Sequence, residues 1–128
     1  MLKDRNSSAI VAVGDIDRAR AFYQDILGLT LEEAYAESGV LGFRTGETFL
    51  IVYKSDYAGS NRANAVVWTM NGDLVDTVNE LRAKGVVFDQ YDELQGLDFK
   101  DGVYSDGPMK LAWFKDPDGN ILHLNEGM

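Results

Sequence analysis

Short apolar runs and one helical stripe alternate along the first half of the chain. Residues 8–13 form a β-branched run that predicts a strand, and the apolar residues that follow recur at helical spacing up to Leu27. Asp15 is a candidate N-cap for this helix, and Gly28 is a candidate left-handed terminator. Three more apolar runs, separated by turn residues, predict strands over residues 29–36, 40–44 and 49–54. The first half is therefore predicted to run strand, helix and three strands.

The same order begins again after residues 55–64, a small and polar segment without periodicity. Residues 65–70 predict a strand, Asp73 is a candidate cap, and the helical stripe after it ends at Gly85. Further strands are predicted over residues 86–91, 111–115 and 120–124. Residues 92–109 are glycine-rich and acidic, and they predict a loop that has room for one short strand.

The two halves are an internal repeat of about 58 residues, which is the spacing between Asp15 and Asp73. A supersecondary unit of this size is too small to bury its own apolar face, so the copies are expected to pack together. We therefore predict a first βαβββ module over residues 1–54, a linker over 55–64 and a second module over 65–128. Together they are expected to make one compact domain.

The segment VGDIDRARAFYQDILGL contains the first predicted helix, and LAWFKDPDGNILHL contains the last predicted hairpin. Both resemble the glyoxalase, bleomycin-resistance and extradiol-dioxygenase (vicinal oxygen chelate) superfamily. The segment AKGVVFDQYDELQGLDFKDGV is similar to a branch of small stand-alone members. The resemblance implies an α+β fold in which two βαβββ modules form curved sheets around an open cleft that holds the active or binding site. It also implies a homodimer.

Metal-dependent members of that superfamily typically carry histidine, glutamine and glutamate ligands on the first and last strands of each module. By resemblance, the corresponding positions here fall on Ser8, near Ala65, on the apolar strand FLIVY and on His123. A divalent metal needs three or four protein ligands, and only His123 qualifies. We therefore expect neither a metal nor another cofactor.

His123 is the only histidine of the chain, and three roles remain open for it. It packs or forms a hydrogen bond, it contacts a ligand or transfers a proton, or it binds a metal. It is the only candidate general acid or base, because its imidazole titrates near neutral pH. Aromatic residues on the predicted strands also suit a cavity for planar ligands. The candidate ligand-binding residues are Ser8, Tyr53, Trp113 and His123.

The last hairpin has a predicted register. Pro117, Asp118 and a left-handed Gly119 make a three-residue loop, which sets Trp113 opposite His123. The two side chains are then expected to share one face of the hairpin and to point into the cleft.

Composition narrows the possible partners. The formal net charge of −9 disfavours nucleic acid and anionic membranes, and it favours a cationic ligand. The absence of cysteine excludes disulfides and thiolate chemistry. No apolar run approaches the roughly 20 residues of a membrane helix, so a cytoplasmic location is expected.

Three functions remain open. The first is a metal-independent protein that binds a small cationic or aromatic compound and sequesters it. The second is a lyase, isomerase or dioxygenase of the same superfamily with a metal site that the sequence does not reveal. The third is an interaction module whose cleft is filled by side chains. The first fits the missing ligands, the acidity and the aromatic residues best.

Overall fold

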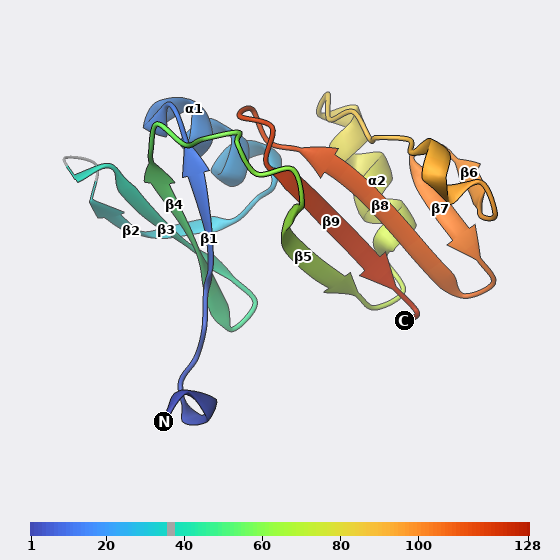
Figure 1. Cartoon of the computed structure of the whole chain (residues 1–128), viewed down its shortest axis with the longest axis horizontal. Helices are drawn as coiled ribbons and strands as arrows, with labels where there is room; N and C mark the ends of the chain where they lie inside the picture. The colour runs from blue at the N-terminus through green and yellow to red at the C-terminus, as the bar shows by residue number, and fades with distance from the viewer. Residues whose placement is uncertain (36–37) are drawn as a thin grey trace. The chain divides into compact units, whose positions relative to one another are not determined.

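The computed structural model describes residues 1–35 and 38–128, and the chain divides into two units (Figure 1). One unit comprises residues 1–62 and 117–120, and the other comprises residues 63–116 and 121–128. Each unit contains one open sheet, so the predicted α+β fold of two modules is confirmed. No helix in the described part of the chain is long and apolar enough to cross a membrane.

The first unit follows the predicted order of strand, helix and three strands. Its elements are η1 (Leu2–Asp4), β1 (Ala9–Val13), α1 (Ile16–Arg20), η2 (Ala21–Ile26), β2 (Thr30–Tyr35), β3 (Val40–Thr45) and β4 (Thr48–Lys54). The sheet has the order β1-β4-β3-β2, with β1 parallel to β4 and the other pairs antiparallel. Position 36, the end of the second predicted strand, lies outside the described residues.

The first helix is only partly regular. Asp15 caps it as predicted, because its Oδ1 accepts hydrogen bonds from the backbone amides of Asp17 at 2.9 Å and Arg18 at 3.1 Å. The helix then widens into the π-helical turn η2, which was not predicted. Two consecutive aromatic residues of this turn, Phe22 and Tyr23, are both buried.

The loop of residues 117–120, which joins the last two strands, belongs to the first unit and is held there by hydrogen bonds. Asp118 Oδ1 accepts hydrogen bonds from the amide of Gly14 at 3.0 Å and from Arg18 Nη2 at 2.8 Å. Asn120 Nδ2 donates to the carbonyl oxygen of Ala12 at 2.8 Å. Gly59 has a φ of +78°, and a Cβ there would clash with the Asp118 carbonyl oxygen, so glycine is required. These contacts restrain the loop that sets the register of the hairpin.

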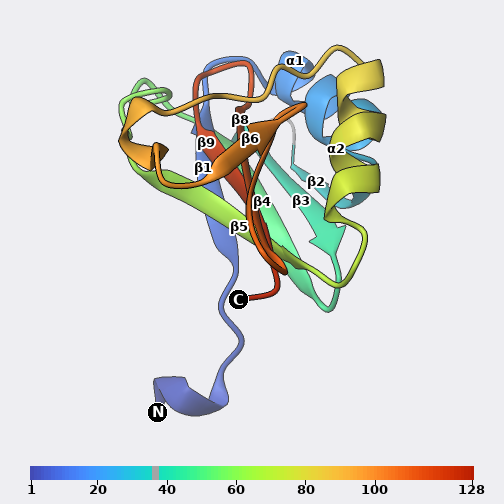
Figure 2. The same ribbon diagram turned by 90° about the vertical axis from the view of Figure 1, so that its right-hand side faces the viewer.

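The second unit repeats the order and adds a strand. Its elements are β5 (Asn64–Met70), α2 (Leu74–Ala83), η4 (Asp92–Leu94), β6 (Asp98–Lys100), β7 (Val103–Asp106), β8 (Met109–Lys115) and β9 (Ile121–Glu126). The sheet has the order β5-β9-β8-β7-β6, with β5 parallel to β9. Helix α2 covers one face of this sheet (Figures 1 and 2). Its buried residues Leu74, Val78 and Leu81 form the core of this unit with the inward side chains of β8 and β9.

Two predictions for residues 86–109 are wrong. Residues 86–91 are not a strand, and only Phe88 bridges to Phe114. Strand β7 already pairs with the start of β8, so only a short stretch of β8 is left for this segment. The predicted loop contains the hairpin β6–β7, closed by Asp101 and Gly102 at φ of +51° and +88°. An Asp-Gly pair with both φ values positive is the favoured two-residue hairpin turn.

The predicted cap of the second helix is also wrong. Asp73 has φ −121° and ψ 16°, which is not the extended backbone of a capping residue, and its side chain makes no cap hydrogen bond. The amide of Leu74 instead donates to Oε1 of Glu126 at 3.0 Å. Residues more than 50 positions apart in sequence therefore meet at the start of α2, which no local pattern shows.

Candidate functional site

Trp113 and His123 lie on the face of the second sheet that points away from α2. They are directly paired between β8 and β9, as the loop chemistry predicted. Leu122 and Leu124 flank His123 in sequence and are buried on the helix side. Because side chains alternate along a strand, His123 must point to the other face. The predicted register is confirmed.

Three aromatic side chains form a row across β7, β8 and β9. The Trp113 indole and the His123 imidazole are stacked, with ring centres 4.5 Å apart and planes inclined by 18°. Tyr104 meets the indole edge-on at 5.9 Å, and Tyr91 does so at 5.5 Å. The strand order places Tyr104 and His123 on opposite sides of Trp113. We call Tyr104, Trp113 and His123 the aromatic row.

The imidazole of His123 has a defined hydrogen-bonding state. Its Nδ1 lies 3.0 Å from the carbonyl oxygen of Ala112, which can only accept, so Nδ1 carries the proton. The other nitrogen, Nε2, is then an acceptor in the neutral ring. Burial lowers the pKa of His123 below its ordinary value of 6.5, and the hydrogen bond to Ala112 offsets this only in part. The neutral form is therefore favoured at neutral pH.

The Tyr104 hydroxyl fixes the backbone of Tyr91 beside the row. It accepts a hydrogen bond from the Tyr91 amide and donates to the Tyr91 carbonyl oxygen. The same segment is held by Lys115 Nζ, which lies 3.0 Å from Asp89 Oδ2. Burial and the Asp89 carboxylate raise the pKa of the Tyr91 phenol, so this side chain remains a neutral hydrogen-bond donor.

Asn125 adds a polar group that sequence analysis missed. It lies two positions after His123 on β9 and therefore shares its face, about 7 Å further along the strand. Its Oδ1 is buried and has no hydrogen-bond partner in the described part of the chain. A buried acceptor without a partner in the protein is rare in native structures, and it is available to a water molecule or to a donor on a ligand. Its spacing of two residues from His123 on a predicted strand was the sequence signal that could have identified Asn125.

The other two predicted site residues are not brought together. Ser8 is exposed and directly precedes β1, whereas Tyr53 is half-buried on β4 and pairs with Ala12. Four residues of extended chain separate Ser8 from Ala12, which corresponds to about 13 Å. Both residues belong to the first unit, so their role as ligand-binding residues stays a prediction.

The residues present do not fit a divalent metal. Nδ1 of His123 is occupied by a carbonyl group, and the ring is stacked on Trp113. The residues of β9 on the same face as His123 are Ile121 and Asn125, neither of which has a carboxylate. Within residues 1–35 and 38–128, no three histidine, aspartate or glutamate side chains gather in a way that could hold a metal ion.

Comparison with known families agrees with this fold. Residues 7–124 match the model of the Glyoxalase/Bleomycin resistance protein/Dioxygenase superfamily. The chain belongs to this superfamily. The resemblance inferred from the helix and hairpin segments is thereby confirmed. No curated protein sequence matches this superfamily member.

Several solved structures resemble this superfamily member over nearly the whole chain. A lactoylglutathione lyase from Agrobacterium tumefaciens has a TM-score of 0.67 and 17% identity, covering 97% of this chain and 94% of the other. Fosfomycin resistance protein FosX from Listeria monocytogenes, complexed with Mn(II) and sulfate, has a TM-score of 0.72 and 16% identity, covering 98% and 91%. An integron cassette protein from the mobile metagenome of the Halifax Harbour sewage outfall has a TM-score of 0.70 and 13% identity, covering 96% and 98%. At these identities the likeness shows the fold alone.

Proposed function

We propose that this superfamily member binds a small planar compound, without a metal, at the aromatic row of its second unit. The observation that carries the proposal is the stacked pair Trp113 and His123, with the partnerless Oδ1 of Asn125 on the same face. An apolar aromatic surface with a few oriented polar groups is the usual pattern of a small-molecule site. Sequestration of such a compound is the function that this arrangement supports best.

The polar groups define what the ligand must offer. Nε2 of neutral His123 and Oδ1 of Asn125 are both acceptors, so they require hydrogen-bond donors on the ligand. The row supplies ring edges and flat surfaces for an aromatic body. The net charge of −9 favours a cation at long range. A protonated heteroaromatic amine satisfies all three conditions.

A thermal-shift screen tests the proposal with defined probes. A protonated aminoquinoline has the ring, the charge and the N–H donors, whereas N-methylquinolinium has the ring and the charge without a donor. The aminoquinoline should raise the melting temperature, because a ligand that binds only the folded state stabilises it. Naphthalene carboxylate, a planar anion, is the control and should have little effect. Equal responses to all three compounds would contradict the proposed chemistry.

Purified protein should contain no stoichiometric divalent metal after dialysis. Ser8, the apolar β4 and the engaged Nδ1 of His123 leave too few ligands for tight binding. Elemental analysis by mass spectrometry measures this directly. Zinc, nickel, manganese or iron retained at about one equivalent per chain would reject the metal-independent proposal and favour the lyase, isomerase or dioxygenase alternative.

His123 should make both stability and binding depend on pH. Its folded-state pKa is lowered, so the unfolded chain binds more protons near pH 6. This contribution to stability is therefore complete above the ordinary value of 6.5 and is lost as the pH falls toward and through the folded-state pKa. Affinity for the aminoquinoline should fall over the same range, since a protonated ring repels the cation and no longer accepts a hydrogen bond.

The measurement is unambiguous because the chain has a single imidazole. NMR titration of that ring gives the folded-state pKa, and calorimetry at several pH values gives the affinity. His123→Gln should remove this pH dependence of binding. A ring that titrates at or above its ordinary value would contradict the description of His123 as buried and neutral.

The homodimer and the cytoplasmic location expected from sequence stay predictions. They are not required for the proposed binding chemistry, which involves residues of one unit only.

A further inference from the structure

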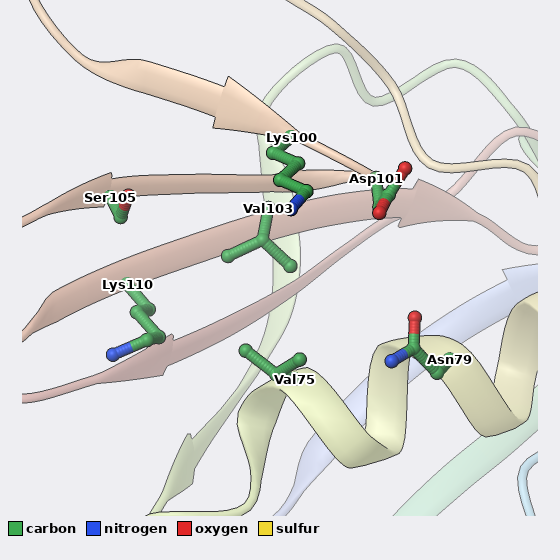
Figure 3. A pocket seen from close by; sticks show the side chains of 7 residues that line it. All are labelled: Val75, Asn79, Lys100, Asp101, Val103, Ser105 and Lys110. Carbon is green, nitrogen blue, oxygen red and sulfur yellow. The ribbon is translucent and has the colours of Figure 1, made fainter.

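A cavity lies between helix α2 and the second sheet, and Figure 3 shows the side chains that line it. The aromatic row is on the opposite face of this sheet. The volume of the cavity is about 260 Å³. Val75 and Asn79 line it from α2, and Val103 and Ser105 line it from β7. Tyr104 lies between the last two in sequence and points to the other face, so this cavity is separate from the proposed ligand site.

The packing of α2 explains why space remains there. The buried stripe of the helix runs through Leu74 and Val78, and Val75 lies beside this stripe with 41% of its surface exposed. The hairpin β6–β7 widens the sheet past the helix. Its turn is held in place because Gly102 packs closely on Phe88 and Val78, where an added Cβ would lie 2.9 Å from the Phe88 Cβ. The β6–β7 turn at this cavity is therefore held by the core.

The cavity has two apolar lining residues, Val75 and Val103, and several hydrogen-bond donors around them. Lys100 on β6 and Lys110 on β8 contribute ammonium groups, and Ser105 and Asn79 contribute a hydroxyl and an amide. Figure 3 shows the Lys100 side chain extending over Val103. This set of groups suits an anion that carries a short hydrocarbon part.

The neighbouring carboxylates already have cationic partners. Asp101 lies 3.9 Å from Arg82 Nη1, and Glu126 lies 4.0 Å from Lys110 Nζ while it also accepts the Leu74 amide. Lys100 forms no ion pair within the described part of the chain. It is the cation at this cavity whose charge is not balanced by an adjacent carboxylate.

The acidity of the whole chain limits the charge of the ligand. The net charge of −9 opposes anions at long range, but this field is screened beyond roughly 8 Å at physiological ionic strength, so the unpaired Lys100 dominates locally. Asp101 at the rim still disfavours a doubly charged group. A monoanion is therefore favoured over phosphate.

We propose that this cavity binds small branched monocarboxylates. The carboxylate contacts Lys100 and Ser105, and the branched end lies between Val75 and Val103. Isovalerate is the probe, and isovaleramide, which has the same shape without the charge, is its matched control.

NMR titration of protein labelled at its valine methyl groups tests the proposal. Isovalerate should shift the Val75 and Val103 methyl signals saturably, and isovaleramide should bind at least about tenfold more weakly because charge-assisted hydrogen bonds are lost. Lys100→Gln should weaken isovalerate binding about tenfold, while Lys100→Arg should retain most of the affinity. Lys100 is exposed, so both variants keep the fold.

Two controls separate this cavity from other effects. Lys3→Gln removes the same charge in the first unit, and His123→Gln alters the aromatic row; both should leave isovalerate binding unchanged. Equal binding of isovaleramide, unchanged affinity in Lys100→Gln, or loss of affinity in Lys3→Gln overturns the proposal. Inorganic phosphate that binds as tightly as isovalerate also overturns it, because the site would then hold an adventitious ion only.

Discussion

Replacing Tyr104 by alanine should lower the free energy of unfolding by roughly 3–5 kcal/mol, the range for deletion of a buried aromatic side chain. Tyr104 is 2% exposed and contacts Phe99 with ring centres 4.6 Å apart. Its loss leaves a cavity beside Trp113 and frees the backbone of Tyr91. Chemical denaturation monitored by circular dichroism measures the change.

Two variants separate the ring of Tyr104 from its hydroxyl. Tyr104→Phe keeps the packing and removes only the hydrogen bonds to Tyr91, so it should cost about 1–3 kcal/mol. Tyr57 is 79% exposed, and Tyr57→Ala should change stability by less than about 0.5 kcal/mol. A Tyr104→Ala variant as stable as Tyr57→Ala would show that the aromatic row is not part of the packed core.

Replacing Trp113 by alanine should weaken binding of the aminoquinoline by roughly 1–2 kcal/mol, or about tenfold in Kd. The indole separates His123 from Tyr104, so its loss removes an aromatic contact and leaves the imidazole without its stacking partner. Trp113→Phe keeps a ring and should lose less affinity. Isothermal titration calorimetry gives these values.

A second measurement on Trp113→Ala needs no ligand. Burial lowers the pKa of His123, and removal of the stacked indole exposes the ring, so its pKa should rise toward the ordinary value. Trp68→Phe is the control, because Trp68 lies on β5 in register with Leu124, on the helix side of the sheet. It should change neither the affinity for the aminoquinoline nor the pKa of His123. Unchanged affinity in Trp113→Ala would remove this residue from the site.

The separation of the two faces of the second sheet has a functional consequence. The aromatic row and the lysine-lined cavity share strands β7 and β8 but use alternate residues, because successive side chains point to opposite faces. The aromatic cation and the small carboxylate that we propose as ligands are therefore expected not to compete for the same groups. Variants at the aromatic row therefore serve as controls for carboxylate binding at the cavity, and Lys100→Gln serves as a control for binding at the aromatic row.

Much of the fold and part of the site followed from local sequence patterns. The Asp15 cap, the order of strands and helices in the first unit, and the pairing of Trp113 with His123 were predictable because each depends on residues close in sequence. The loop Pro117–Asn120 sets the register by its own turn chemistry. The β6–β7 hairpin also has a local signal, because the dipeptide Asp101-Gly102 is typical of a two-residue hairpin turn. The acidic and glycine-rich composition around it predicted a loop instead.

Other features depend on contacts between distant segments, and no local pattern contains them. The amide of Leu74 is capped by Glu126 rather than by Asp73, because the end of β9 reaches the start of α2 only in the folded sheet. Residues 86–91 have strand composition, but β7 already pairs with residues 109–111 of β8, and only Phe88 bridges to the rest of that strand. For the strands that were predicted, the sequence alone determined which residues share a face, because side chains alternate along a strand. Only the tertiary structure decided which partners meet there, since burial and unpaired polar atoms such as Asn125 Oδ1 arise from packing.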